Sequence, residues 1–167
     1  MIYKISELCE ITSSKRIFAN EYTKNGIPFY RGKEIIELAE GKSISTDLYI
    51  SQEKFNEIKS KYDTPKYGDI LLTAVGTLGI PYFVTNTNFY FKDGNLMWFK
   101  NFNNFCISKF FYYYLQSSHF KNIVLTKAIG STQKAITIDT IKNTKINIPE
   151  LVNQQHIVNI GGILNAY

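Results

Sequence analysis

The segment from residue 130 to residue 137, GSTQKAIT, groups side chains that could contact nucleic acid. Hydroxyls and amides beside a glycine suit phosphate oxygens, and a glutamine can bind the adenine edge in the major groove with two hydrogen bonds. The candidates are Gly130, Ser131, Thr132, Gln133 and Lys134, with Lys127 shortly before them. The same pattern also fits a polar turn that begins a short helix over residues 136–141, with Thr137 as its cap. Both interpretations remain open at this point.

A second group of candidates lies in the first fifth of the chain, where basic and aromatic residues alternate. They are Lys15, Arg16, Tyr30, Arg31 and Lys33. Arg16 and Arg31 are the two arginines, and a guanidinium offers the planar fork that reads guanine or holds a phosphate. Arg31 follows a predicted strand and precedes Gly32, which favours a functional role. For any single lysine, a solvated basic surface is the alternative.

Signatures of catalysis and of metal binding are missing from the sequence. The glycines of residues 76–79 are not followed by the Gly-Lys-Ser/Thr of a nucleotide-binding loop, and there is no Gly-x-Ser-x-Gly. His119 and His156 have no second ligand at metal spacing. Glu57-Ile58-Lys59 with Asp47 upstream imitates part of a nuclease motif, but it falls on a predicted charged helix. We therefore expect no catalytic centre, no cofactor and no metal.

The composition fits a folded domain with an anionic partner. The 167 residues are 44% hydrophobic, with 12 Tyr and 12 Phe, which is enough for a core without disulfides. The net charge of +5 and the pI near 9.1 favour nucleic acid as a partner. Cys9 and Cys106 are far apart in the sequence and are predicted to be buried, reduced thiols. The N-terminus resembles no signal segment, and the expected compartment is the cytoplasm.

Hydrophobic spacing predicts an α+β domain. Helices are expected over residues 2–11, after a Ser51 cap with Phe55 and Ile58 inward, over 108–119, and from about 149–153 to the end of the chain. Strands are expected at 27–31 and 145–148. Four further apolar runs between residues 68 and 100, bounded by Gly and Pro, are predicted to be neighbouring strands of one sheet.

Six segments, in order along the chain, resemble the specificity subunits of type I restriction–modification systems. They lie at residues 4–11, 26–35, 68–79, 91–99, 130–137 and 147–158. Each one alone is a weak signal, and the resemblance rests on their order and separations. It covers nearly the whole chain.

The resemblance implies a single target recognition domain over residues 1–148, with a mostly antiparallel twisted sheet and flanking helices. Residues 149–167 would begin a spacer and dimerisation helix, with Gln154, Ile157, Ile160 and Leu164 toward a partner. The sequence departs from the family in having Glu150 where a second proline is common. Gly161-Gly162 also falls inside the presumed helix, where each glycine costs about 1 kcal/mol.

A domain of this kind would read one half-site of a split target in double-stranded DNA. By the resemblance, it would direct a methyltransferase subunit and a restriction/translocase subunit to that site. A second recognition domain would come from homodimerisation or from a longer chain. The alternative from a different class is a protein-interaction module in which the basic charge is incidental; a titration of binding against salt separates the two.

Overall fold

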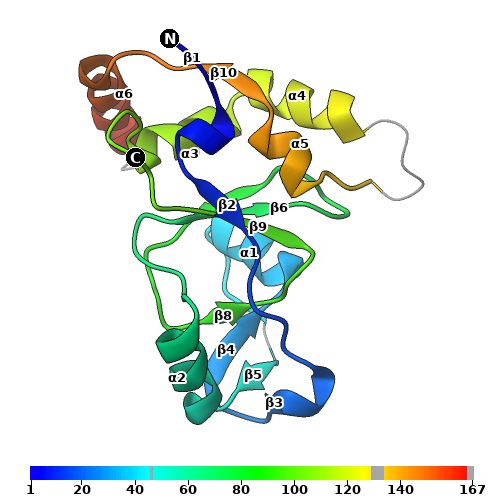
Figure 1. The fold of residues 1–167 in the computed structure, drawn as a ribbon. Helices are drawn as coiled ribbons and strands as arrows, with labels where there is room; N and C mark the ends of the chain where they lie inside the picture. The colour runs from blue at the N-terminus through cyan, green and yellow to red at the C-terminus, as the bar shows by residue number, and fades with distance from the viewer. Residues whose placement is uncertain (46, 129–133, 165–167) are drawn as a thin grey trace.

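The computed structural model describes residues 1–45, 47–128 and 134–164, with side chains up to residue 162. Three sheets follow one another along an elongated molecule (Figure 1). A two-stranded sheet pairs β1 (Ile2–Lys4) with β10 (Lys145–Asn147), and it lies beside the helices at one end. A central four-stranded sheet and a second four-stranded sheet complete the order.

The central sheet is antiparallel and buried on both faces. Its order is β2 (Glu10–Thr12), β9 (Leu96–Lys100), β6 (Ile70–Thr73) and β7 (Pro81–Phe83). Alternate residues point to opposite faces, as strand geometry requires. Ile70 and Leu72 join the core under α3 (Ser108–Gln116), while Leu71 joins the core under α1 (Gly32–Ala39). A strand buried on both sides explains why these runs are almost wholly apolar.

The third sheet corrects the expectation that the four runs share one sheet. Its order is β3 (Tyr22–Thr23), β5 (Tyr49–Ile50), β4 (Ile27–Tyr30) and β8 (Tyr90–Phe91), with β8 parallel to β4. The polar stretch at residues 85–88 carries the chain from the central sheet to β8. Local apolar pattern identifies a strand but not its partner, so the prediction placed β8 in the wrong sheet.

The predicted helix after Ser51 is confirmed as α2 (Gln52–Lys61). The Ser51 hydroxyl accepts a hydrogen bond from the Lys54 amide at 3.0 Å, which satisfies one of the free donors at the helix start. Phe55 and Ile58 are buried against the third sheet, as predicted.

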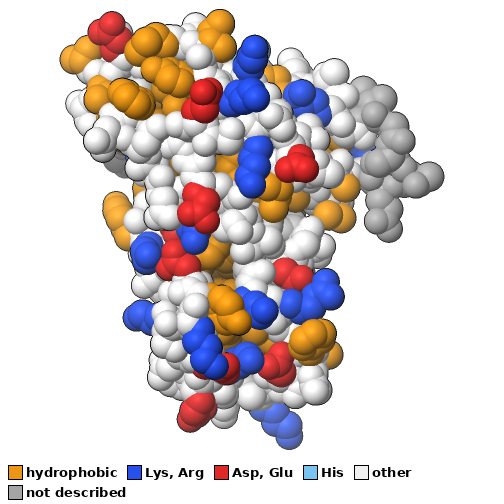
Figure 2. Space-filling model, viewed as in Figure 1, with side chains coloured by type: hydrophobic (Ala, Val, Ile, Leu, Met, Phe, Trp, Pro, Cys, Tyr) orange, Lys and Arg blue, Asp and Glu red, His pale blue; other side chains and the backbone are white. Residues whose placement is uncertain are grey.

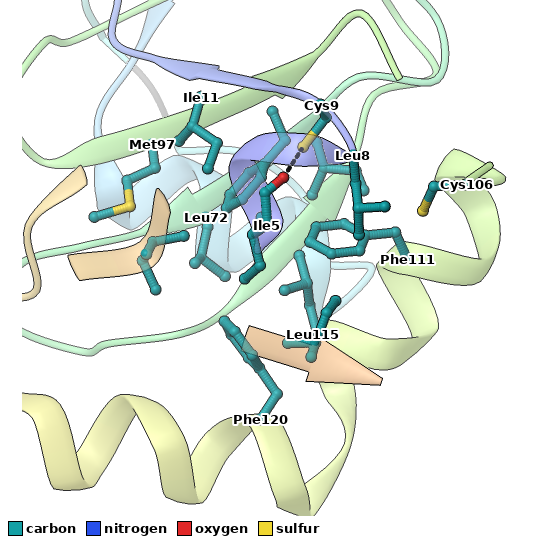
Figure 3. Close-up of a cluster of buried hydrophobic side chains, with 14 of the residues drawn as sticks. Ile5, Leu8, Cys9, Ile11, Leu72, Met97, Cys106, Phe111, Leu115 and Phe120 are labelled. Carbon is teal, nitrogen blue, oxygen red and sulfur yellow. Dashed lines mark hydrogen bonds between the residues drawn. The ribbon is translucent and has the colours of Figure 1, made fainter. Parts of the chain in front are cut away.

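The predicted opening helix is wrong. Residues 2–12 form β1, a 3-10 turn (Ile5–Glu7) and β2. Ile5 and Leu8 are fully buried, so the apolar spacing did mark core residues (Figure 3). The strand forms because β1 pairs with β10, a partner more than 140 residues away that no local pattern indicates.

Helix α3 and the next two helices along the chain lie at the same end of the molecule as the β1–β10 sheet, and they pack on the hydrophobic core that contains Leu72. The predicted helix over 108–119 ends at Gln116, and a second helix, α4 (Ser118–Ala128), follows after a break. The Ser117 hydroxyl accepts from the Phe120 amide at 3.2 Å and so caps α4. Phe111, Leu115 and Phe120 meet Leu72 of the central sheet in this core. The short helix α5 (Ile138–Lys142) has the predicted cap, since the Thr137 hydroxyl accepts from the Thr140 amide.

The C-terminal helix α6 (Leu151–Leu164) is fastened to the body of the domain. The Gln154 side chain is fully buried, accepts from the Ile107 amide and donates to the Phe105 and Pro149 carbonyls, each at 2.8 Å. The prediction that Gln154 faces a partner is therefore corrected: its amide is used within the chain. Ile157 and Ile160 are 39% and 45% exposed, and the Leu164 side chain lies outside the described residues.

Gly161 has a packing reason to be glycine. A Cβ at this position would lie 2.6 Å from the Tyr113 ring of α3, whereas a Cβ on Gly162 would meet nothing within 4 Å. The helix continues through both glycines, and Gly161 is the one that permits the close contact between α6 and α3.

Candidate nucleic-acid interface

The hairpin formed by β6 and β7 is the centre of the candidate interface. Val75, in its turn, forms an isolated antiparallel bridge with Ala135. The Gly76 amide donates to the Lys134 carbonyl and the Ile136 amide to the Ala74 carbonyl, both at 3.0 Å. The end of the GSTQKAIT segment is thus tied to the hairpin tip. Ser131, Thr132 and Gln133 lie outside the described residues.

A cleft of about 720 Å³ lies between the hairpin and α1, along the whole length of that helix. Arg31, Lys33 and Lys42 line it on the α1 side, and Thr73, Val75, Thr77 and Asn95 line it on the hairpin side. Arg31 and Lys33, which are about 100 residues from Lys134 in the sequence, are therefore brought to the same hairpin.

Arg31 fixes the start of α1 through Glu34. The fully buried Glu34 carboxylate accepts from the Arg31 backbone amide at 2.8 Å and from its guanidinium at 2.7 and 3.3 Å. Burial alone would raise the pKa of Glu34, but these hydrogen bonds and the charge of Arg31 hold that pKa below its usual value. The Arg31 side chain remains 37% exposed, with Asp47 at 3.8 Å. It therefore combines a structural contact with a face open to the cleft.

Tyr30 does not contribute to this surface. It is 6% exposed, and its ring stacks on Phe89 with centroids 4.9 Å apart. The predicted contact between Tyr30 and DNA does not fit this position, because the ring belongs to the core beneath α1. The alternation of basic and aromatic residues did not distinguish a strand residue that faces inward.

The arm at residues 13–16 is held against residues 91–94, which lead from β8 to β9, and its Ser13 and Ser14 face the hairpin across a cleft. The Ser13 hydroxyl accepts from the Gly94 amide at 3.3 Å, and the Ser14 hydroxyl donates to the Phe91 carbonyl at 2.7 Å. Arg16 pairs with Asp93 at 2.9 Å. A second cleft, of about 390 Å³, lies between this arm and the hairpin, and Ser13, Ser14, Val75 and residues 135–138 line it.

These contacts define one continuous surface, which we call the hairpin surface. Its members are Ser13, Ser14, Arg16, Arg31, Lys33, Lys42, Val75, Gly76, Thr77, Asn95, Lys134 and Ala135. The sequence did not point to Lys42, Thr77 or Asn95. A signal for Thr77 existed in the glycine turn at 76–79, but its closeness to the arm and to α1 depends on the fold.

Most cations of the hairpin surface already have a carboxylate neighbour. Lys33 lies 4.0 Å from Glu37, and Lys42 pairs with Glu40. Lys134 and Lys127 are exposed and form no ion pair within the described ranges. Figure 2 shows basic and acidic side chains interspersed on the visible face, so charge is spread rather than concentrated. Because exposed ion pairs are weak, a phosphate can compete for these cations.

The described residues contain no group of three or more His, Cys, Asp or Glu placed to hold a metal. Asp47 lies beside Arg31, whereas Glu57 is paired with Lys54 and Lys61, so each serves an ion pair. Cys9 and Cys106 are buried and free, and burial raises the pKa of both thiols. Over the same described residues, no helix is long and apolar enough to cross a bilayer.

Comparison with known proteins decides the family. Residues 1–160 match the sequence profile of the type I restriction modification DNA specificity domain. The chain belongs to this family. The predicted resemblance is therefore confirmed, and the expectation of a recognition domain rather than a catalyst agrees with the family's description.

One relative is a putative type I restriction enzyme specificity subunit, S.HindORF215P, of Haemophilus influenzae. It is 34% identical over 160 residues, which are 95% of this chain and 38% of the relative. The chain thus spans less than half the length of the curated relative that it matches.

Solved specificity subunits share the fold. The HsdS subunit from Thermoanaerobacter tengcongensis superposes with a TM-score of 0.68 at 21% identity, over 96% of this chain and 36% of that one. The S subunit from M. genitalium gives 0.66 at 18% identity, over 99% and 39%. The predicted α+β recognition-domain fold with a C-terminal helix is confirmed by these likenesses.

Proposed function

We propose that this domain recognises a short half-site in duplex DNA as the specificity component of a type I restriction–modification system, and that the hairpin surface makes the contact. One observation carries the proposal. Segments that are far apart in the sequence gather around the tip of one hairpin: Ser13 and Ser14 of the arm, Arg31 and Lys33 beside α1, and Lys134. Arg16 adds a cation at the edge of the second cleft through its ion pair with Asp93. Family membership gives the ligand class, and this convergence supports its location.

Within the hairpin surface, cations and base-reading groups have different tasks. Arg16, Lys33 and Lys134 supply phosphate contacts, which position the domain but carry no sequence information. Gln133, outside the described residues, and the open face of Arg31 supply contacts to base edges. A two-stranded ribbon fits the major groove, so the hairpin tip has a suitable shape to enter it.

The proposed partner subunits rest on family membership, and the proposed second recognition domain rests on the length of the relatives and on α6. A methyltransferase subunit and a restriction/translocase subunit would act at the site that the domain selects. A second recognition domain, from a second copy or a longer chain, would read the other half-site and raise the overall affinity through effective concentration. We divide the chain into a recognition domain of residues 1–148 and a spacer helix from residue 149, with Ile157, Ile160 and Leu164 available to the partner. The cytoplasm is the proposed compartment.

The test is selection from a randomised duplex pool in the presence of the cognate methyltransferase subunit. We expect enrichment of one short motif. Replacing Lys33 and Lys134 by glutamine should weaken binding and reduce the log–log salt slope by about 0.9 for each lost phosphate contact. The matched control changes Lys24 and Lys145, which are exposed lysines outside the hairpin surface, in the same way. It should keep the slope of the unmodified protein.

Two outcomes would contradict the proposal. A folded domain that pairs with its methyltransferase but enriches no motif does not read DNA through this chain. A flat salt dependence would instead favour the protein-interaction module, for which exposed apolar side chains such as Phe105 and Val152, 56% and 72% exposed, would provide the contact.

A further inference from the structure

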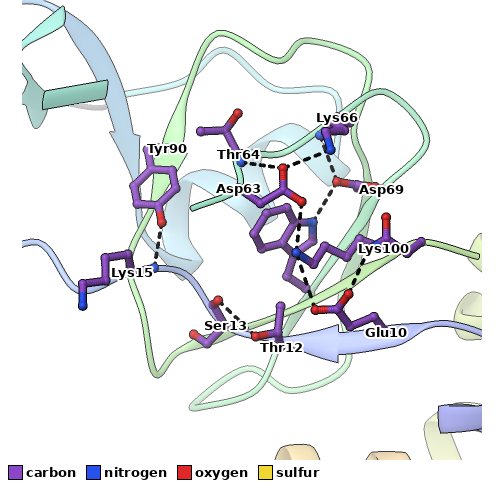
Figure 4. Close-up of polar contacts among 12 residues, drawn as sticks. Glu10, Thr12, Ser13, Lys15, Asp63, Thr64, Lys66, Asp69, Tyr90 and Lys100 are labelled. Atoms are coloured by element: carbon purple, nitrogen blue, oxygen red, sulfur yellow. Dashed lines mark hydrogen bonds and ion pairs between the residues drawn. The ribbon is translucent and has the colours of Figure 1, made fainter. Parts of the chain in front are cut away.

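A further cleft, of about 470 Å³, lies between the arm and the C-terminal end of α2. Figure 4 draws the polar contacts of several residues that line it, among them Lys15, Asp63 and Lys100. Its lining includes Ser13, Ser14, Lys15, Lys61, Tyr62 and Lys100. We call it the α2 cleft. Ser13 and Ser14 also line the 390 Å³ cleft of the hairpin surface, so the arm forms a wall of both clefts.

The floor of the α2 cleft is a saturated polar network. The Lys100 ammonium lies 3.0 Å from Asp63, 3.5 Å from Glu10 and 4.4 Å from the centre of the Trp98 ring, and its side chain is only 11% exposed. The Trp98 indole donates to Asp69 at 2.8 Å. Each charge here has its partner within the chain. The floor therefore joins the central sheet to the segment after α2, and the charge of Lys100 is balanced within the chain by Asp63 and Glu10.

The rim differs from the floor because Lys15 is held without being neutralised. Its backbone amide donates to the hydroxyl of the buried Tyr90 at 2.7 Å, and its ammonium lies 5.0 Å from the centre of the Tyr62 ring. Within the described residues Lys15 forms no ion pair, whereas the adjacent Arg16 is paired with Asp93. The ring contact orients the ammonium but leaves its positive charge available.

We propose that the rim of the α2 cleft binds a phosphate of the DNA strand that leaves the hairpin surface across the arm. Lys15 is the phosphate-binding residue, Tyr62 positions its ammonium, and Lys61 adds a second cation. This inference rests on the proposed function and adds α2 to the interface. A cation already ordered before binding loses less conformational freedom when the phosphate arrives.

The chemistry of the rim suits the sugar-phosphate backbone better than a base edge. Lysine presents a compact charge with rotatable donors, which binds phosphate without reading sequence. Lys61 pairs with Glu57 at 3.0 Å, but both side chains are about half exposed, so a phosphate can compete for it. The α2 cleft should therefore contribute affinity and orientation and leave the selected motif unchanged.

The experiment measures binding of the full chain, with its methyltransferase subunit, to the duplex enriched by selection. Lys15→Gln should reduce the salt slope by about 0.9, which makes the affinity about threefold less sensitive to salt between 50 and 200 mM. Tyr62→Ala should weaken binding about two- to fivefold, from the usual strength of an exposed cation–π contact. Tyr62→Phe, which keeps the ring, should bind like the unmodified protein.

The matched control is Tyr67→Ala. Tyr67 is another exposed tyrosine, 73% exposed, and it does not line the α2 cleft. An unchanged slope for Lys15→Gln, or equal binding by Tyr62→Ala and Tyr67→Ala, overturns the inference while the proposed function stands. A changed motif in Tyr62→Ala also overturns it, since the contact would then read bases. No DNA binding by the unmodified protein overturns both proposals.

Discussion

Glu34 of α1, beneath the hairpin surface, and Gln154 of α6 are both fully buried polar side chains, but their partners differ. Glu34 is charged, and its chief partner, Arg31, keeps an exposed face in a cleft. Gln154 is neutral, and its three partners are backbone groups of the same domain. The first contact can serve structure and ligand together. The second serves only to hold α6, and this contrast separates the candidate interface from its support.

The largest expected effect comes from removing the α6 support. Gln154→Leu keeps the approximate volume but leaves three partly buried backbone groups without a partner: the Ile107 amide and the Phe105 and Pro149 carbonyls. Each such group costs about 1 kcal/mol, the low end of the range for unsatisfied groups. We expect a loss of about 3 kcal/mol in the free energy of unfolding, measured in urea. Gln155→Leu, on the exposed side of the same helix, should change it by less than about 0.5 kcal/mol. Equal effects would mean that the buried amide is not the support.

Removing the Arg31–Glu34 contact should lower the free energy of unfolding by a smaller amount, and this amount should depend on pH. Arg31→Met leaves a buried carboxylate without its cation, and because Arg31 is partly exposed we expect about 2 kcal/mol at neutral pH. In the unmodified protein the pKa of Glu34 is lowered, so its contribution is present above the usual glutamate pKa and is lost as pH falls through the lowered value.

In the Arg31→Met variant, burial dominates and raises the pKa of Glu34, so the folded state is disfavoured as the pH rises. The difference in the free energy of unfolding between the variant and the unmodified protein should therefore be largest near neutral pH and small in acid. Urea unfolding across this pH range measures it. Lys33→Met, an exposed neighbour, should show almost no difference, and a pH-independent difference for Arg31→Met would contradict the assignment.

The smallest effect has opposite signs at two adjacent residues. Gly161→Ala places a Cβ 2.6 Å from the Tyr113 ring, so overpacking should exceed the gain in helix propensity and destabilise the fold by about 1 kcal/mol. Gly162→Ala meets no atom within 4 Å and should stabilise it by up to about 1 kcal/mol. Thermal unfolding distinguishes the two. Stabilisation by both alanines would show that α6 does not need the close contact with α3.

Local signals were sufficient for several elements. Ser51 and Thr137 each cap the helix that they were predicted to begin, because capping depends on residues only three positions apart. That each apolar run between residues 68 and 100 forms a strand was also predicted. The partner of β8 was not, since β8 pairs in parallel with β4, some 60 residues earlier in the chain. The break between α3 and α4 was missed because the predicted helix was extended through the polar run at residues 116–119, where the Ser117 hydroxyl in fact caps a new helix.

The sequence by itself determined the family, the α+β class and the basic residues that a DNA partner would require, because these depend on composition, order and local spacing. Tertiary structure alone decided which of these residues share a surface. In the folded chain Tyr30 and Gln154 are buried, and Arg31 lines the same cleft as the β6–β7 hairpin. The Lys15 ammonium lies over the ring of Tyr62. Side-chain direction and long-range pairing are set by the packing of the whole chain, and no short window of residues contains that information.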